Sequence, residues 1–411
     1  MVTFNKADEN WILEQIDRMA QYGKNGDGVT RLAFSEADRL VREHVIRLMR
    51  EIGLEVRIDA AGNIIGRLQG LQALAPVIIG SHSDTVPGSS KYDGALGIVG
   101  ALAAINALRS GSVLTHPVEV VVFTAEESSR FNYATLGSKA MAGHINLHAW
   151  SKAKDKHGVL LSQAMLKSGL DLGKIAEASR VGEPIKAFIE LCIDQGETLH
   201  DEEGRIGIVE ISAAPTRIKM TIEGIAAHSN TPMDMRQDAL VSAAMIVLAV
   251  QEIGMDNEYN GTLATVGNLQ VHPGVINMIS GKVELLVDIR GTDQDNIVAV
   301  LQDIKDSVST IAEGQDTPVS IEVLSSEKPI LMDAAINLLI EEFCKERSIT
   351  FRRINSGTGH NSMNMSQLTP SGMILIPSHR ESEPFVNEQV ENEDIFTGVK
   401  VLMHVISELA K

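Results

Sequence analysis

The stretch Pro76-Val77-Ile78-Ile79-Gly80 is a short, continuous apolar run, and it is followed at once by the polar residues Ser81, His82, Ser83 and Asp84. Such a run is typical of a strand buried on both faces of a largely parallel sheet. Residues 94–110, rich in Ala, Leu and Ile at helical spacing, come next, and a second apolar run at residues 118–123 follows them. Strand, helix and strand in this order form a β-α-β unit, so the sequence predicts an α/β fold with a mostly parallel sheet.

The segments on either side extend this domain. Residues 35–51 have apolar side chains at helical spacing, with Ser35 as a plausible N-cap. Gly62-Asn63 lies within an alternating stretch and indicates a hairpin turn. A third apolar run, at residues 187–192, predicts a further buried strand.

From about residue 211 the pattern changes to alternating strands, which favours an antiparallel sheet with helices on one face. The helical and apolar pattern of the first domain returns near residue 325. We therefore predict a catalytic domain over residues 1–210 and 326–411, with an α+β domain inserted over residues 211–325. The elements expected after residue 210 are strands at 216–223, 261–270, 281–290 and 373–376, and helices at 238–253, 333–346 and 393–409.

Composition excludes some partners. The chain of 411 residues has a formal net charge of −18 and no run rich in Lys or Arg, which disfavours binding to nucleic acid. Its two cysteines, Cys192 and Cys344, are too few for a disulfide framework. Charged residues stand where a signal peptide needs an apolar core, and no stretch of about 18 apolar residues is evident, so we expect a cytoplasmic protein with no membrane partner.

Polar clusters follow each of the three predicted buried strands, at His82-Ser83-Asp84, at Glu126-Glu127 and at residues 192–196. Ligands bind outside the carboxyl ends of strands in open α/β sheets, so these clusters should converge. Imidazole and carboxylate suit zinc, manganese and similar ions. Asp84 could orient the His82 ring, and Asp93, in the loop before a helix, could bridge two ions.

Each of these features alone has an ordinary explanation. A lone loop histidine is more often a surface or hydrogen-bonded residue, and paired glutamates usually form a solvated face. Their joint placement at strand ends favours a metal site. There, one member of the pair Glu126-Glu127 could bind metal while the other activates a water as general base.

The segments Gly80-Ser-His82-Ser-Asp84, Tyr92-Asp93-Gly94 and Ala125-Glu126-Glu127 closely resemble the aminoacylase and carboxypeptidase-like metallopeptidase superfamily of the M20 type. Ser129-Arg130-Phe131 and Ile193-Asp194-Gln195-Gly196 narrow the resemblance to its hydantoinase/carbamoylase branch. That branch includes N-carbamoyl-L-amino-acid hydrolases, β-ureidopropionase and allantoate amidohydrolase. Further similar segments follow in order along nearly the whole chain.

The resemblance implies a role for each matching residue. It implies metal ligands, a catalytic base, a histidine that polarises the scissile carbonyl from a dimer partner, and groups that hold the substrate and its carboxylate. It also implies that the inserted domain acts as a lid and forms a homodimer. The implied ligands are His82, Glu127 and a bridging Asp93, and the implied base is Glu126. The histidine that polarises the carbonyl is His228. The groups that hold the substrate are Asn277, Arg290, Gln195, Gly359 and His360.

The chain departs from the branch at several positions. Cys192 and Pro384 stand where the family has metal-binding histidines, and Asn361 and Asp194 stand where it usually has Asp and Glu. A thiolate can replace histidine in a zinc site, so we predict Cys192 as a further ligand, with a small core residue as the equal alternative. Proline has no ligating side chain. One divalent ion, zinc or manganese, is therefore expected rather than two.

These inferences predict a metal-dependent amidohydrolase, which cleaves a carbon–nitrogen bond other than a peptide bond. The substrate would be small, would resemble an N-carbamoyl or N-acyl amino acid, including allantoate, and would carry a carboxylate. The alternative is a catalytically impaired descendant that binds a small carboxylate or a protein partner, because two family ligands are missing. Glu126, a base that a pure binder does not need, favours the enzyme.

Overall fold

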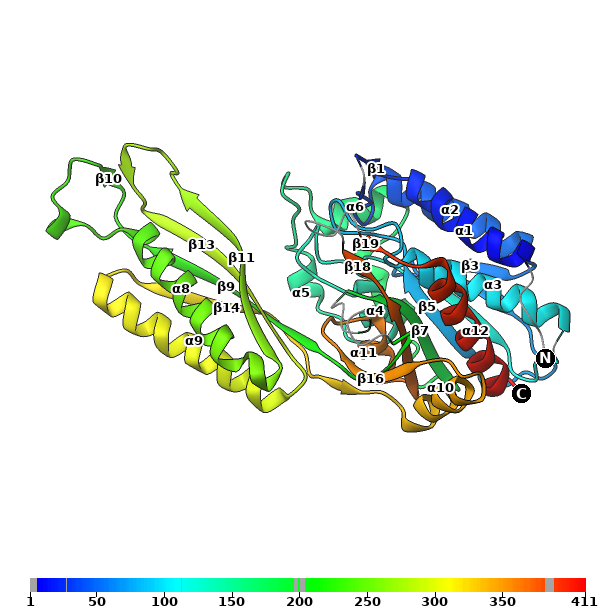
Figure 1. The fold of residues 1–411 in the computed structure, drawn as a ribbon. Coiled ribbons are helices and arrows are strands. Elements are labelled where there is room, and N and C mark those ends of the chain that lie inside the picture. The colour runs from blue at the N-terminus through cyan, green and yellow to red at the C-terminus, as the bar shows by residue number, and fades with distance from the viewer. Residues whose placement is uncertain (1–5, 27, 112, 196–198, 200–203, 381–387) are drawn as a thin grey trace. The chain divides into compact units, whose positions relative to one another are not determined.

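The computed structural model describes residues 6–26, 28–111, 113–195, 199, 204–380 and 388–411. The chain divides into two compact units (Figure 1). Unit 1 consists of Met1–Glu210, Leu331–Ser356 and His360–Lys411, and unit 2 consists of Ile211–Ile330 with Gly357–Gly359. Pro384, a predicted departure from the family pattern, lies outside the described residues.

Unit 1 is built on a sheet that has nine strands within the described residues, in the order β15-β8-β17-β7-β5-β6-β4-β3, with β16 paired to β8. Its four central strands run parallel to one another, so their carboxyl ends share one edge of the sheet. The antiparallel neighbours β3, β4 and β8 lie outside this centre. The bounds are β5 (Val77–His82), β6 (Val118–Phe123), β7 (Ala187–Asp194), β17 (Ser371–Pro377), β3 (Glu55–Ile58), β4 (Ile64–Leu68), β8 (Ile206–Ser212), β15 (Ile330–Leu331) and β16 (Phe351–Ser356).

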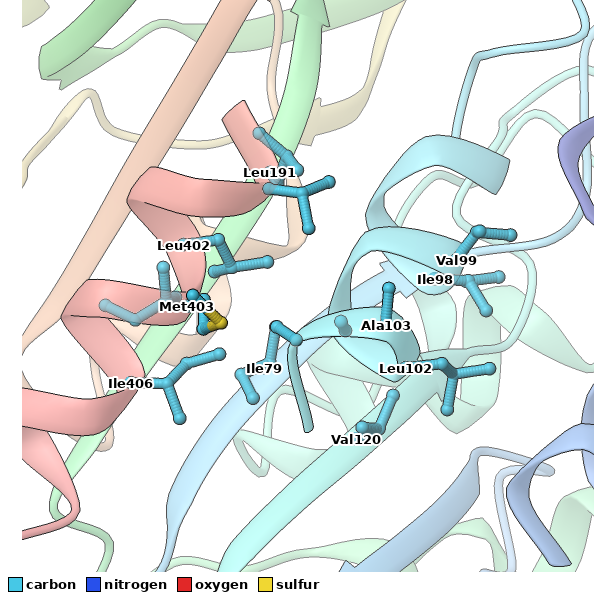
Figure 2. Packing of buried hydrophobic residues seen from close by; sticks show 14 of the residues in the cluster. Ile79, Ile98, Val99, Leu102, Ala103, Val120, Leu191, Leu402, Met403 and Ile406 are labelled. Carbon is cyan, nitrogen blue, oxygen red and sulfur yellow. The ribbon is translucent and has the colours of Figure 1, made fainter. Parts of the chain in front are cut away.

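Helices cover both faces of this sheet, which explains the continuous apolar runs. Successive strand residues point to opposite faces, so Ile79 packs toward α3 (Ala95–Gly111) and α12 (Asn392–Leu409), as Figure 2 shows. Ile78 belongs to a separate buried cluster on the other face. Each fully buried side chain of this size contributes about 1.5–3 kcal/mol. The predicted α/β architecture is confirmed.

Local signals set the elements before β5. Helix α2 (Glu36–Glu51) begins where predicted, because the Ser35 side chain accepts a hydrogen bond from the backbone N–H of Asp38 at 3.2 Å. Gly53 follows the helix with φ +82°, a left-handed conformation that glycine adopts without strain. The turn at Gly62-Asn63 connects the antiparallel strands β3 and β4, as predicted.

Unit 2 contains an antiparallel sheet in the order β11-β13-β9-β14. Two helices, α8 (Ala239–Asn257) and α9 (Gln294–Gln315), pack against it and bury alternate side chains of its strands (Figure 1). Asp238 caps α8 by accepting a hydrogen bond from the backbone N–H of Leu240 at 2.9 Å. This is the predicted α+β arrangement. The strands are β9 (Ala214–Glu223), β11 (Thr262–His272), β13 (Lys282–Gly291) and β14 (Val319–Ser326).

One sequence expectation was wrong. Ala239–Asn260 is long and apolar enough, by length and composition, to cross a membrane, although the sequence was expected to hold no such stretch. Polar residues such as Ser242, Gln251 and Glu252 interrupt the apolar run, but the mean hydropathy over 18 residues stays high. In unit 2 the buried side chains of α8, among them Ala243, Ile246 and Val250, lie in the core, which is the ordinary position of an apolar helix. The cytoplasmic location stays a prediction.

Shorter elements complete the described chain. They are α1 (Lys6–Gln21), β1 (Lys24–Asn25), β2 (Gly28–Val29), α4 (Leu136–Met141), α5 (Leu147–Trp150), α6 (Leu161–Lys167), η1 (Leu172–Ala178), β10 (Ala227–His228), η2 (Met233–Met235), η3 (Glu258–Asn260), β12 (Met278–Ile279), α10 (Ala334–Glu346), α11 (Asn361–Met365), β18 (His379–Arg380) and β19 (Glu388–Gln389).

Candidate metal centre

His82 lies at the end of β5 and its ring is almost fully buried. Its Nδ1 lies 2.9 Å from the backbone carbonyl oxygen of Asp84, to which it can donate a hydrogen bond. Donation from Nδ1 leaves the Nε2 lone pair available for a cation. That Nε2 lies 3.7 Å from Asp93 Oδ1 and 3.9 Å from Glu126 Oε2.

The backbone of Gly94 lies close against the His82 ring. Its backbone has φ +65°, and a Cβ placed there would lie 2.3 Å from the His82 carbonyl oxygen and 2.8 Å from two atoms of the ring. Only glycine gives this close approach of the α3 N-terminus to β5. The predicted loop residue Asp93 is thereby brought to the histidine.

Asp84 acts differently from the prediction. Its carboxylate lies 3.9 Å from His82 Nδ1, beyond hydrogen-bond distance, and the backbone carbonyl orients the ring instead. The carboxylate accepts hydrogen bonds from the backbone N–H groups of Glu126, at 3.1 Å, and Glu127, at 3.0 Å. Ala125, just before them, has φ +50°, an uncommon conformation for alanine. Asp84 therefore positions the glutamate pair.

Arg31, which the sequence did not single out, supports the same loop. Its buried guanidinium donates hydrogen bonds to the carbonyl oxygens of Ser83, at 2.5 Å, and of Met19 and Tyr22, both at 3.0 Å. Burial lowers the pKa of Arg31 to about 10, while Asp38, Asp84 and Asp93 oppose that shift. A single Arg in a run of ordinary loop residues offers no sequence signal for this role.

Glu126 and Glu127 hold their protons unusually tightly. Burial raises the pKa of Glu126 to about 8 and that of Glu127 well above its ordinary range. Burial opposes the charged form of His82, but the carboxylates of Glu126 and Asp93 outweigh it and raise the pKa of the ring to about 10. Mutual repulsion among buried carboxylates is what a divalent cation relieves. The charge of this cluster therefore suits a divalent metal. The structure brings Asp93 and Glu126 to His82, but the ligand atoms of His82, Asp93 and Glu127 do not all lie within 4.8 Å of one another.

A second group of donors lies on β7 and directly before α11. Ligand atoms of Glu190, Cys192 and His360 all lie within 4.8 Å of one another. No other set of three His, Cys, Asp or Glu residues comes this close within the described part of the chain. Cys192 Sγ lies 3.9 Å from His360 Nδ1. Burial raises the pKa of the Cys192 thiol well above its ordinary value. Glu190 was missed because it stands inside an apolar run, although a charged residue in a buried strand is itself a signal.

The remaining predicted residues are distributed between the units. Gln195 is half-buried directly after β7 in unit 1, whereas Gly359 belongs to unit 2. His228 and Asn277 are exposed in unit 2, and Ser229 N–H donates to the Asn277 carbonyl at 3.0 Å. Arg290, on β13, donates from Nε to Asp288 Oδ2 at 2.6 Å.

Asp288 also orients a second arginine. Its other carboxylate oxygen accepts a hydrogen bond from Arg217 Nε at 3.2 Å. The hydrogen bond from Arg290 Nε to Asp288 orients the guanidinium of Arg290 within unit 2. The roles that the resemblance implies for all these residues stay predictions.

This chain has a largely parallel sheet with an imidazole and several carboxylates at its carboxyl edge, and this arrangement is typical of metallohydrolases. The chain belongs to the family described as peptidase family M20/M25/M40, whose model matches residues 78–408. It is 35% identical to a ureidoglycolate hydrolase of Arabidopsis thaliana, over 98% of this chain and 87% of that protein. It is 33% identical to an N-carbamoyl-L-amino-acid amidohydrolase of Paenarthrobacter aurescens, over 99% of this chain and all of that one.

Solved structures agree with these relatives. A crystal structure of an amidase of the hydantoinase/carbamoylase family from Burkholderia vietnamiensis has a TM-score of 0.91 and 30% identity, and covers 99% of both chains. The predicted family and branch are therefore confirmed. The protein is a metal-dependent hydrolase of carbon–nitrogen bonds other than peptide bonds, as the sequence predicted.

Proposed function

We propose that this protein hydrolyses the amide or ureido bond of a small N-carbamoyl- or N-acyl-amino-acid-like substrate, with Glu126 as general base. The observation that carries the proposal is the buried Glu126 carboxyl, 3.9 Å from His82 Nε2, with a pKa raised by burial to about 8. A carboxyl that titrates near neutral pH both accepts and donates protons efficiently.

The proposed metal ligands are His82, Asp93 and Glu127, which would hold one divalent ion, zinc or manganese. Cys192, whose thiol interacts with Asp93 and Glu126 as well as with Glu190, is the proposed further ligand of this ion. The ion, when bound, would polarise the substrate carbonyl and stabilise the negative charge that develops on it.

Glu126 would take a proton from the attacking water and give it to the leaving nitrogen. His228, supplied by a partner subunit, would stabilise the oxyanion. Arg290, oriented by Asp288, would hold the substrate carboxylate in a bidentate pair, assisted by Asn277. Gln195, Gly359 and His360 would complete the pocket. Relatives that act on ureidoglycolate and on N-carbamoyl-L-amino acids support a substrate of this chemistry.

The test is Glu126→Gln in metal-loaded protein, assayed with ureidoglycolate, allantoate, N-carbamoyl amino acids and N-acyl amino acids. Turnover of the preferred substrate should fall about 10²–10⁴-fold with the metal content unchanged. Glu183→Gln, which changes an exposed glutamate, is the matched control. Unchanged turnover in Glu126→Gln would remove the assigned base. Arg290→Lys should mainly raise KM, because lysine cannot form the bidentate pair.

A homodimer through unit 2 is the proposed assembly. Strand β11 lies at the edge of the unit 2 sheet, and α8 exposes the apolar side chains of Leu248 and Met255, each 66% accessible. An exposed strand edge beside apolar side chains is typical of an interface. Leu248→Glu should give a monomer in light-scattering measurements, and a dimer that survives this change would place the interface elsewhere.

A further inference from the structure

Two arginines share one aspartate on the unit 2 sheet. Arg217 on β9 lies directly opposite Asp288 on β13, and Arg290 follows Asp288 by two residues on the same strand. The neighbouring side chains of Ile218 and Ile289 lie in the core with α8 and α9, so the charged side chains point to the opposite face of the sheet. There they form a triad, Arg217–Asp288–Arg290, whose side chains are between 18% and 33% exposed.

Each arginine uses only its Nε–H for the aspartate. Arg217 donates to Asp288 Oδ1 at 3.2 Å, and Arg290 donates to Asp288 Oδ2 at 2.6 Å. The terminal nitrogens of a guanidinium carry its remaining N–H donors. Among the residues that the structure describes, Arg290 has no other hydrogen-bond partner. Its guanidinium is therefore oriented by Asp288 and still has donors for a further carboxylate.

The charge of the triad depends on Arg217. Two guanidiniums and one carboxylate leave one unit of positive charge for an anion. Without Arg217, Asp288 would neutralise Arg290, and both carboxylate oxygens could form a bidentate pair with that one guanidinium. A substrate carboxylate would then have to compete with Asp288 for the donors of Arg290.

We propose that Arg217 is a positioning residue, which occupies one oxygen of Asp288 and offsets its charge so that Arg290 stays available for a carboxylate. The inference rests on the proposed function, in which Arg290 holds the carboxylate of the substrate. It adds that the affinity for this carboxylate comes from the net charge of the triad and not from Arg290 alone. One surplus charge matches a ligand that presents a single carboxylate here.

A second group of three charges on the same face supplies a matched control. Lys219 Nζ lies 2.8 Å from Glu284 Oε1, and Lys282 Nζ lies 3.1 Å from the same oxygen. This group also has two cations and one carboxylate, and Lys219 is two residues from Arg217 on β9. Lys219→Met therefore removes a positive charge from the same strand and face, but it leaves the triad intact.

Butyrate is the probe, because it has a carboxylate but no bond that a hydrolase cleaves, and butanol is its neutral comparison. Ligand-observed NMR measures binding to the metal-loaded full chain, and the binding lost in Arg290→Met is the part assigned to the triad. Arg217→Met should weaken that part about tenfold or more, whereas Lys219→Met should leave it unchanged. Adding Asp288→Asn to Arg217→Met restores the surplus charge and should return the affinity to within about twofold of its original value.

A merely structural role of Arg217 would not be rescued by removing its partner as well. Butyrate binding that does not depend on Arg290, that is unchanged in Arg217→Met, or that is not recovered in the folded double variant would overturn the proposal. Thermal melts check folding. With a substrate that the protein turns over, Arg217→Met should raise KM and leave kcat almost unchanged. Butyrate binding needs no turnover, so a protein that binds butyrate through the triad without hydrolysing any substrate would contradict the proposed function alone.

Discussion

Gly94→Ala tests whether the orientation of His82 determines metal binding. The added Cβ would lie 2.3 Å from the His82 carbonyl oxygen and 2.8 Å from ring atoms Cε1 and Nδ1, whereas real Cβ atoms keep at least 3.0 Å from such neighbours. Either β5 or the start of α3 must therefore move, and the ring turns with it. A change in the support of a metal-binding histidine weakens metal affinity by about 10–100-fold.

Gly158→Ala is the matched control for backbone strain. Gly158 has φ +80° and Gly94 has φ +65°, but a Cβ at Gly158 would have no neighbour within 4 Å. Both variants should lose about 1–2 kcal/mol of stability from the left-handed conformation alone. Urea unfolding measures that loss, and calorimetric titration with zinc or manganese measures affinity. If Gly94→Ala binds metal as tightly as Gly158→Ala, the assignment of His82 as a ligand is refuted.

Three further outcomes follow from buried charge. Binding of the divalent ion near pH 7 should release protons, because a cation lowers the pKa of Glu126 from about 8. Calorimetry in two buffers with different ionisation enthalpies measures the number of protons released. The Glu126→Gln variant should release fewer than the unchanged protein. Burial lowers the pKa of His404, stacked on Phe343, below 6.5, so stability should be at its full value above that pH and fall as pH drops through the lowered pKa. His404→Gln should flatten this slope in urea unfolding. Arg180→Met removes one of the two arginines that pair with the buried Glu119. Because Arg67 stays 2.7 Å from the other carboxylate oxygen, the change should cost about 1.5–3 kcal/mol in the same assay, and a loss under about 0.5 kcal/mol would contradict the pairing.

The parallel sheet could be predicted because its strands are buried on both faces. Strand β6 has the predicted bounds, and β5 and β7 extend two residues further than their apolar runs, through the polar residues His82 and Asp194. Hydrophobicity marks the buried part of a strand, but hydrogen bonding to neighbouring strands sets its end. The same limit explains why α8 continues to Asn257, beyond the predicted end near Ile253.

Strand ends also predicted which polar segments converge, but not the atoms that meet. His82, Asp93 and Glu126 lie together because β5, β6 and α3 end or begin at one edge of the sheet. That Asp84 orients the ring through its carbonyl, while its carboxylate binds two backbone N–H groups, depends on loop dihedrals. One such dihedral, the φ of +50° at Ala125, is unusual for its residue type and has no sequence signal.

The charge balance at this edge of the sheet connects the fold to its cofactor. Burial raises the pKa of Asp84 to about 6 and that of Glu126 to about 8. Without a cation, a proton therefore neutralises Glu126 near pH 7, whereas Asp84 is neutralised only below about pH 6. The nearby guanidinium of Arg31 donates to backbone carbonyls and is shared among several acids. Protons and a divalent ion therefore compete for the same carboxylates, and stronger metal binding at higher pH follows directly.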